Sequence, residues 1–394
     1  MRRLQWRSPA AFKAADGMKM ASTRIYGFDG LRGIGAMLVV LTHYGVFMNT
    51  RATAAGMGPG PMSLRFFFVL SGFLITLLLI REQEQFGCVS LTFFYIRRAF
   101  RIVPLYVMFL VFLSAVKVFV YPPVAGWRSL LYGWLYLYNF IPRDHYNGVQ
   151  GHTWSLAVEE HFYLLWPVLF VLLFPRRKAG LMLLCAAAAL CAVALDAFLG
   201  GQASLARYFV GRWTFTAGGS IFQGCLAALV VTHRAFASRA RRIRGSPYLL
   251  AACPLLWTGP LWGLDLGLPT TRALQATGFA LLVTWLYFNQ GALLTRLLDF
   301  PPLRYLGQIS YGIYVYHGLF LGTGPSRAPG EIWPPDPTVG LLVVCVVAPL
   351  SYHGFEKRLT AIGQRFRQRA ASPAAPVAPS QAGTDAGLAA EMSP

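Results

Sequence analysis

The feature that most constrains this chain is a series of long apolar segments. A helix needs about 17 to 25 apolar residues to cross a bilayer, and ten segments come close to or reach that length: roughly 33–50, 65–80, 102–120, 155–174, 180–199, 212–232, 247–264, 273–289, 305–322 and 338–354. Only 13% of the residues are charged, whereas a soluble domain has about a quarter. We therefore expect an all-α, multi-pass membrane protein, a helical bundle of about ten transmembrane helices.

The basic residues predict the orientation of the chain. The formal net charge of +20 would suit a nucleic-acid-binding protein, but the basic residues lie in short clusters between apolar segments rather than on one domain. A further apolar stretch, 129–141, is short and rich in Tyr and Trp. If it does not cross, 25 of the 35 Lys and Arg residues face the cytosol and eight face outward, as the positive-inside rule favours. We therefore expect both termini to lie in the cytosol and the stretch 129–141 to lie at the outer interface. We expect no nucleic-acid partner.

The chain divides into three parts. Residues 1–25 are basic without an apolar core of their own, so we expect a cytosolic extension rather than a cleaved signal. Residues 26–358 form the transmembrane domain. Residues 359–394 are expected to be a cytosolic tail, basic at first and then rich in Ala and Pro, a composition that predicts disorder. The six cysteines stand singly, and their spacing indicates neither a disulfide framework nor a metal site.

Two ionisable residues mark the first predicted helix, in the segment GFDGLRGIGAMLVVLTHYG at 27–45. Arg32 and His43 are 11 positions apart, so on a helix they project within ~20° of each other and are separated by roughly 16 Å along the axis. Ionisable groups inside membrane helices are costly and indicate function by default. Two alternatives stay open: a snorkelling anchor for Arg32, and a packing residue hydrogen-bonded across helices for His43.

A second polar stretch, HTWSLAVEEHFYLLWP at 152–167, lies at the outer entrance of the fourth predicted helix. Glu159 shares a helical face with Ser155 and Tyr163. Glu160 points about 100° away. We therefore expect only one of the two acids to face a common pocket.

The histidines of this stretch do not predict a metal site. His152 and His161 are nine positions apart and lie on opposite helical faces, and the adjacent side chains of Glu160 and His161 diverge. We expect no metal. Glu159 brought near His43 would instead form a His–carboxylate pair, in which the acid orients the imidazole while the imidazole takes a proton from a hydroxyl.

A third stretch, FYIRRAFRIVPLY at 94–106, carries arginines on the predicted cytosolic side. Arg98 and Arg101 are three positions apart and neighbours on one helical face, and guanidinium pairs bind phosphate in a two-pronged fashion. The alternative is a positive-inside cluster that contacts lipid headgroups. For Arg97 we favour that alternative; for the other two the spacing leaves both open.

Two smaller signals accompany these stretches. In ISYGIYVYHG, 309–318, Tyr311, Tyr314 and His317 follow each other at spacings of three, and this stripe of polar-tipped side chains either lines a pocket or forms an interfacial belt. In RFFFVLSGFLIT, 65–76, the small residues Ser71 and Gly72 predict a close approach of two helices.

Taken together, these motifs resemble the acyltransferase-3 family of integral membrane O-acyltransferases, which includes O-antigen acetylases, exopolysaccharide and Nod-factor acylases, and macrolide acylases. The resemblance implies a multi-pass protein of the bacterial inner membrane that uses acyl-CoA, most often acetyl-CoA, as donor and a hydroxyl, usually of a sugar in an envelope or exported glycan, as acceptor. The matching segments occur in the family's order and span roughly residues 26 to 356: FDGLRGIGAMLVVLTHYG, FFFVLSGFLIT, RRAFRIVPLY, HTWSLAVEEHFYLLWP and SYGIYVYHG.

The resemblance also implies roles for single residues. Arg32 and His43 match the family's essential pair, Glu159 matches the acid of its WSLxxE motif, and Arg98 with Arg101 matches the RxxR pair that holds the nucleotide end of CoA. Further side chains are candidates for the substrate pocket: Ser155, Tyr163, Tyr311 and His317.

The mechanism expected from these roles begins with His43. Oriented by Glu159, it deprotonates the acceptor hydroxyl, which attacks the thioester; in an alternative, His43 itself is transiently acylated. The acceptor could also be a small molecule such as a macrolide or a glycolipid. A proton-coupled transporter is the rival class, but such a carrier has no need of a clamp for a CoA-sized anion.

Overall fold

The computed structural model describes residues 24–45, 58–174, 177–200, 209–233, 246–258, 267–322, 333 and 336–371. Within these ranges all regular secondary structure is helical, as expected for an all-α bundle. The α-helices are α1 (Phe28–Tyr44), α3 (Pro59–Phe86), α4 (Leu91–Ala115), α5 (Trp127–Trp134), α6 (Thr153–Leu173), α7 (Lys178–Gly200), α9 (Thr214–Thr232), α11 (Pro247–Thr258), α12 (Leu268–Phe288), α13 (Leu293–Leu298), α14 (Pro301–Gln308), α15 (Ser310–Leu321), α16 (Pro337–Ser351) and α17 (Lys357–Ala371).

Shorter helical turns connect several of these helices. Two are π-helical: η3 (Val116–Val120) extends α4, and η9 (Tyr352–Glu356) joins α16 to α17. The others are 3₁₀ turns between α4 and α6: η4 (Pro122–Val124), η5 (Tyr138–Phe140), η6 (Arg143–His145) and η7 (Gly148–Gln150).

Six helices in the described part of the chain are long and apolar enough to cross a membrane. They cover Pro59–Phe86, Leu91–Val120, Thr153–Leu173, Lys178–Leu199, Thr214–Thr232 and Pro337–Arg365. The expected total of ten spans and the cytosolic location of both termini stay predictions. On α7 and α16 many large apolar side chains are exposed, as a lipid-facing surface requires: Leu183, Leu190, Phe198, Leu342 and Leu350.

The aromatic stretch 129–141 forms no long helix. α5 has eight residues, which span about 12 Å, well short of the roughly 30 Å of a bilayer core. The chain then continues into the single 3₁₀ turn of η5. This agrees with the expectation that 129–141 does not cross.

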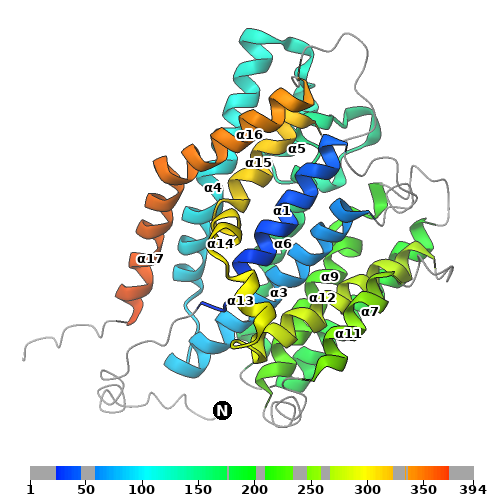
Figure 1. Ribbon diagram of the computed structural model, residues 1–394, viewed down its shortest axis with the longest axis vertical. Coiled ribbons are helices and arrows are strands. Elements are labelled where there is room, and N and C mark those ends of the chain that lie inside the picture. The colour runs from blue at the N-terminus through cyan, green and yellow to red at the C-terminus, as the bar shows by residue number, and fades with distance from the viewer. Residues whose placement is uncertain are drawn as a thin grey trace, which may run out of the picture.

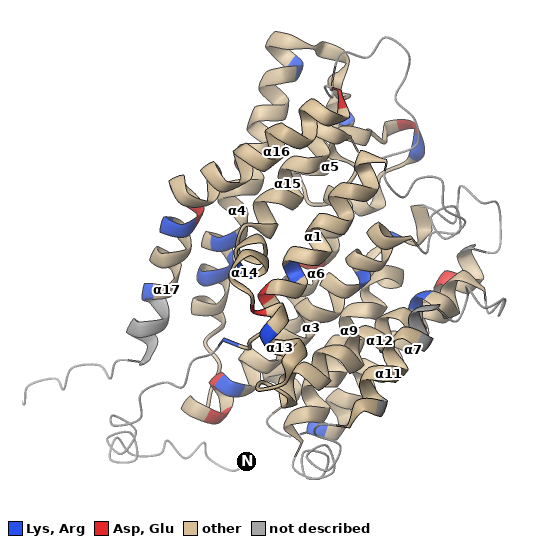
Figure 2. Cartoon of the chain, viewed as in Figure 1, with Lys and Arg blue, Asp and Glu red and all other residues tan. Residues whose placement is uncertain are grey.

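α1 lies between two groups of helices (Figure 1). It packs against α3 on one side and against α14 and α15 on the other. α3 in turn contacts α9 and α12, and α7 and α11 lie outside these two helices, while α4, α16 and α17 lie on the other flank. The charged residues lie mostly near helix ends, except for a group of basic residues in the interior where α1, α4 and α14 lie together (Figure 2).

Two glycines bring α3 and α9 into backbone contact. A Cβ atom on Gly72 would lie 2.0 Å from the carbonyl oxygen of Ile221, and one on Gly224 would lie 2.0 Å from that of Val69. Small residues let membrane helices approach in this way. The close approach expected at Gly72 is therefore confirmed.

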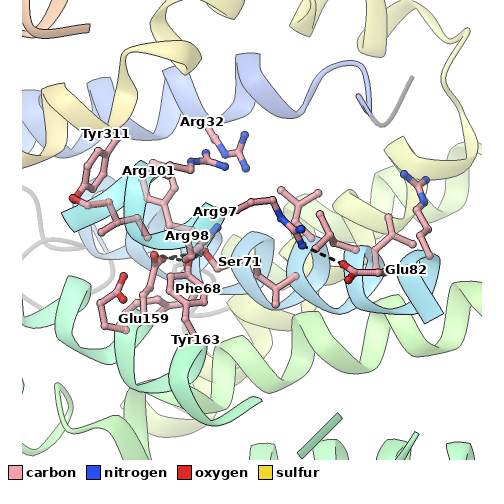
Figure 3. A pocket seen from close by; sticks show the side chains of 18 of the residues that line it. Arg32, Phe68, Ser71, Glu82, Arg97, Arg98, Arg101, Glu159, Tyr163 and Tyr311 are labelled. Carbon is pink, nitrogen blue, oxygen red and sulfur yellow. Dashed lines mark hydrogen bonds and ion pairs between the residues drawn. The ribbon is translucent and has the colours of Figure 1, made fainter. Parts of the chain in front are cut away.

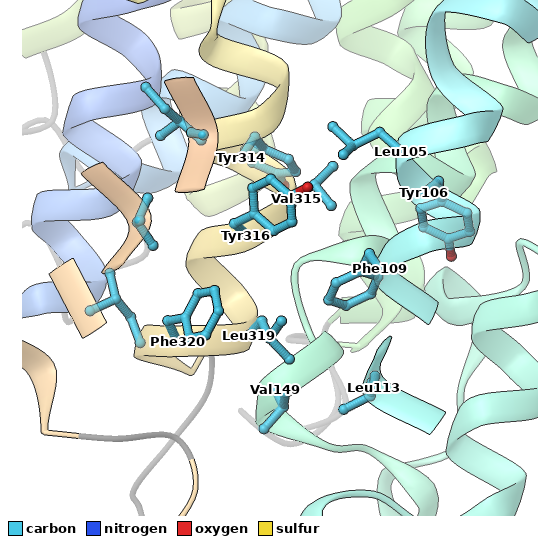
Figure 4. Packing of buried hydrophobic residues seen from close by; sticks show 14 of the residues in the cluster. Leu105, Tyr106, Phe109, Leu113, Val149, Tyr314, Val315, Tyr316, Leu319 and Phe320 are labelled. Atoms are coloured by element: carbon cyan, nitrogen blue, oxygen red, sulfur yellow. The ribbon is translucent and has the colours of Figure 1, made fainter. Parts of the chain in front are cut away.

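A buried apolar cluster fixes α15 against α4 (Figure 4). Leu105, Phe109 and Leu113 on α4 face Val315 and Leu319 on α15, and all five are at most 1% exposed. This packing sets the position of the remaining side chains of α15, which include the tyrosine and histidine stripe.

Candidate functional site

A cavity of about 1080 Å³ opens among five helices, α1, α3, α4, α6 and α15. Each helix contributes polar side chains to its wall (Figure 3). They include five arginines and four glutamates: Arg32, Arg81, Arg97, Arg98, Arg101, Glu82, Glu84, Glu159 and Glu160. Apolar side chains of α3 such as Leu74 and Leu78 complete the lining.

Glu159 on α6 anchors a hydrogen-bond network inside the cavity. Its Oε1 accepts from the hydroxyl of Ser71 on α3 at 3.0 Å, and its Oε2 accepts from the hydroxyl of Tyr163 at 2.7 Å. The Tyr163 and Ser71 oxygens are themselves 3.0 Å apart. Glu159 and Tyr163 meet because they are four positions apart on one helix. The network joins α3 to α6 and holds the carboxylate in one orientation.

Both acids of α6 line the cavity, so the expectation that only one would do so is wrong. The cavity extends around more of α6 than a single helical face, because α3 borders this helix while Tyr314 of α15 and Arg98 of α4 also contact it. Glu160 makes no hydrogen bond with any other described residue, in contrast to Glu159.

The histidines flanking Glu160 point to other parts of the molecule. His161 Nδ1 is 2.7 Å from the hydroxyl of Thr214, and the ring of His152 is buried near α15. Across the described ranges, His, Cys, Asp and Glu side chains form no group of three or more that is arranged to hold a metal ion.

The arginines of α4 differ in their partners. Arg97 donates to Glu82 Oε2 at 3.1 Å, and Glu82 Oε1 accepts from the backbone N–H of Ser90, so this pair closes the turn between α3 and α4. Arg98 instead places its Cζ atom 3.6 Å from the centre of the Tyr163 ring, a cation–π contact. Its buried Nε–H has no hydrogen-bond partner in the part of the chain that the structure describes. Arg101 forms no ion pair with a described residue and exposes its side chain to the cavity.

Arg32 on α1 also lines the cavity, and its side chain lies close to that of Arg101 (Figure 3). Its Nη1 is 3.1 Å from Asp29 Oδ1, one turn earlier on α1. Arg32 is therefore part of the arginine-lined region, whereas His43 is three helical turns away.

His43 does not line the cavity, and its neighbour is another imidazole. The ring centres of His43 and His317 are 5.3 Å apart, and those of His317 and His152 are 4.9 Å apart. No hydrogen bond joins His43 to Glu159 in the described part of the chain. The two carboxylate oxygens instead accept from Ser71 and Tyr163. The direct His–carboxylate pair suggested by the sequence is not formed.

The remaining pocket candidates are placed in two groups. Ser155, Tyr163 and Tyr311 line the cavity, and the Tyr311 hydroxyl donates to the Ile102 carbonyl at 2.8 Å. His317 is fully buried and is not part of the lining. It lies directly behind Tyr314, whose ring centre is 5.1 Å from its own.

Sequence reasoning missed three parts of the site. Ser71 was assigned to helix packing because it adjoins Gly72, and Glu160 was excluded by its helical angle. Tyr314 closes the inner end of the cavity through a hydrogen bond to the Ser155 hydroxyl. In the sequence, only the spacing of three between Tyr311, Tyr314 and His317 indicated that Tyr314 could line a pocket.

The chain matches a family profile described as an acyltransferase domain over residues 25–353. It is similar to a putative peptidoglycan O-acetyltransferase of Bacillus subtilis, with 27% identity over 384 residues, 88% of this chain and 56% of that protein. A peptidoglycan O-acetyltransferase of Listeria monocytogenes is 27% identical over 311 residues, 73% of this chain and 48% of that protein. An O-acetyltransferase of Staphylococcus aureus is 25% identical over 366 residues, 86% and 58% respectively. The chain thus spans about half the length of the curated relatives it matches. No solved structure matches it.

Proposed function

The chain belongs to the acyltransferase family whose profile it matches, and on that premise we propose that it transfers an acetyl group from acetyl-CoA to a sugar hydroxyl of an envelope glycan. The observation that carries the proposal is the cavity in which arginines from α1, α3 and α4 converge with Glu159 and Tyr163 of α6.

The arginines support acyl-CoA as the donor. CoA carries phosphates at one end and a thin pantetheine arm at the other, and a planar guanidinium binds phosphate oxygens with two parallel N–H groups. Arg98 and Arg101 have donors that no carboxylate of the described residues uses. A cavity of about 1080 Å³ lies at the upper end of the range for sites that bind small molecules and cofactors.

The relatives support a glycan acceptor. Two of them are called peptidoglycan O-acetyltransferases, and the third an O-acetyltransferase. We take peptidoglycan as the first acceptor to test for this chain, delivered to the side of the membrane opposite the arginines.

In the proposed reaction the acceptor oxygen attacks the thioester carbon and the carbon–sulfur bond breaks. His43 accepts the hydroxyl proton and donates it to the thiolate of CoA as that group leaves. A general base of this kind contributes typically 10²–10⁴-fold. For this step the thioester would extend past the inner end of the cavity, where Ser155 and Tyr314 meet, because His43 does not line the cavity and lies behind Tyr314 and His317.

Glu159 has a different role in this scheme from the one its motif first suggested. It fixes Tyr163 and Ser71, and the Tyr163 ring supports the guanidinium of Arg98. We assign Glu159 as a positioning residue for the donor site rather than as the partner of His43.

The test uses purified full-length protein in lipid nanodiscs with [¹⁴C]acetyl-CoA and a soluble peptidoglycan digest. We expect label in the digest, and loss of that transfer in His43→Ala. Label that stays on the protein when the digest is omitted would instead indicate an acylated His43 intermediate. If the wild type neither binds acetyl-CoA nor consumes it, the proposed function is wrong.

A further inference from the structure

Three imidazoles lie next to each other behind the inner end of the cavity. His317 is the central one, with ring centres of His43 and His152 at 5.3 and 4.9 Å. His43 is half-buried, whereas His317 is 0% and His152 3% exposed. Two imidazoles that share one N–H···N hydrogen bond of about 2.9 Å have ring centres roughly 5 Å apart. The cluster is therefore close enough for direct hydrogen bonding.

One hydrogen bond defines the tautomer of His317. Its Nδ1 is 2.5 Å from the backbone carbonyl oxygen of Tyr314. A carbonyl oxygen only accepts, so Nδ1 must carry the proton, and in a neutral imidazole Nε2 is then an acceptor. Nε2 is buried and has no hydrogen-bond partner among the described residues. A buried acceptor in this state is unfavourable unless a donor comes within reach.

The groups around Nε2 of His317 limit which donor can reach it. The Tyr314 hydroxyl is 3.1 Å from the His152 carbonyl and also contacts the Ser155 hydroxyl, so it is already engaged. His152 packs against Gly318, where a Cβ atom would lie 1.8 Å from His152 Nδ1. Its two ring nitrogens have no hydrogen-bond partner among the described residues, but at 3% exposure it has no route to a substrate hydroxyl. His43 is the neighbouring donor that also reaches accessible space.

We propose that His317 is the positioning residue of His43: its Nε2 accepts a hydrogen bond from one nitrogen of His43 and leaves the other nitrogen as the base. This inference rests on the proposed function, because it assigns His43 the proton of the acceptor hydroxyl. It replaces Glu159 with a neutral imidazole as the group that fixes the tautomer of the base. No atom of His317 touches the reacting groups.

Substitutions of differing polarity at position 317 test the proposal. In His317→Gln an amide reaches the position of Nε2, in His317→Asn it reaches only that of Nδ1, and His317→Leu carries no polar group. We expect kcat for acetyl transfer to the peptidoglycan digest to fall roughly 10- to 100-fold in the Asn and Leu variants, part of the 10²–10⁴-fold that a general base contributes. The Gln variant should retain several-fold more activity than either. KM for acetyl-CoA should stay unchanged in all three, because His317 does not line the cavity.

The matched control is Tyr316→Phe, which removes a buried hydrogen bond to the Ser351 hydroxyl from the same helix and should leave kcat unchanged. Thermal unfolding in the nanodisc confirms that each variant is folded. If the Leu variant fails to fold, the Gln and Asn variants, both polar, still give the comparison.

The proposal is overturned if Gln is no more active than Asn, or if Leu matches the wild type. A wild-type protein without acetyl transfer would refute the proposed function itself. A wild type that is active but insensitive to the side chain at 317 would refute only the positioning role.

Discussion

At the scale of single residues, the arginines of the cavity differ in whether a carboxylate pairs with them. Arg32 and Arg97 each have an acidic partner at 3.1 Å, so much of their charge is already compensated. Arg98, which is partly buried, and Arg101, which is exposed to the cavity, have no such partner among the described residues, so their N–H donors can bind an anion. An anionic ligand that enters the cavity would supply the missing partner. These two residues therefore should control donor binding.

The first prediction concerns this pair. Arg98→Ala and Arg101→Ala should each weaken acetyl-CoA binding by about 10- to 150-fold, because a hydrogen bond to a charged group contributes about 1.5–3 kcal/mol. Isothermal titration calorimetry on protein in nanodiscs measures the change. Arg97→Ala is the matched control, since its guanidinium already bonds Glu82, and it should bind acetyl-CoA within about threefold of the wild type. An equal loss in all three variants would contradict a specific clamp.

The second prediction concerns the ring beneath Arg98. Tyr163→Leu removes the cation–π contact and should weaken acetyl-CoA binding by about 2- to 30-fold, the equivalent of 0.5–2 kcal/mol. Tyr163→Phe keeps the ring and loses only the hydroxyl, with its hydrogen bonds to Glu159 and Ser71, so it should bind nearly as well as the wild type. The same calorimetric titration compares them. Weak binding in both variants would mean that the hydroxyl, and not the ring, supports the guanidinium.

The sequence could predict which side chains share a helix face, but not what they meet across the bundle. The spacing of Glu159 and Tyr163 on α6 was sufficient to place both in one pocket. Nothing along α6 indicated that Ser71 of α3 would take one carboxylate oxygen. In the same way, the spacing of Arg32 and His43 gave their separation correctly, while the contact of His43 with His317 depends on how α1 and α15 pack.

At the scale of helices, hydropathy located the apolar part of each span and missed polar helical turns at its ends. α4 begins at Leu91, eleven residues before the apolar segment predicted at 102–120. The additional turns carry Arg97, Arg98 and Arg101, which a search for apolar residues excludes. They are helical because Ser90 caps the helix, its side chain accepting from the Phe93 N–H. The arginines of α4 therefore lie on helical turns outside the apolar segment, on the shared helical face that the spacing of Arg98 and Arg101 predicted.

The third prediction tests the contact of α3 with α9. Gly72→Ala would place a Cβ atom 2.0 Å from the carbonyl oxygen of Ile221, so the helices must separate. Overpacking of this kind costs about 1–3 kcal/mol, and the unfolding temperature in detergent should fall by several degrees.

The matched control for that contact is Gly218→Ala on α9. A Cβ atom at Gly218 meets nothing within 4 Å, and alanine favours a helix over glycine by up to about 1 kcal/mol. This variant should therefore unfold at the wild-type temperature or above it. A Gly72→Ala protein as stable as Gly218→Ala would show that the backbone contact does not contribute to stability.

At the scale of the whole molecule, composition was sufficient for the fold class. A chain with 56% hydrophobic residues and 13% charged residues has few alternatives to a helical membrane bundle. The number of spans is less determined, because helices such as α15, with 12 residues, do not have the length of an independent span. The segment predicted at 305–322 is divided between α14 and α15 at Ile309. Such a break follows from packing against α1 and α4, which hydropathy does not describe.

The last prediction joins the orientation of the molecule to its cavity. Cys88 lies between α3 and α4, lines the cavity and is exposed, and the positive-inside rule places its loop in the cytosol. A membrane-impermeant maleimide should therefore label Cys88 in inside-out vesicles and not in right-side-out vesicles, with mass spectrometry identifying the site.

Acetyl-CoA should protect the Cys88 thiol from the maleimide, because the donor would fill the cavity beside it, whereas free acetate should not. Cys191 and Cys345, exposed on the apolar helices α7 and α16, are replaced by Ala in the tested protein, and Cys88→Ala gives the background. Labelling from the outer side would reverse the orientation, and labelling unaffected by acetyl-CoA would place the donor elsewhere.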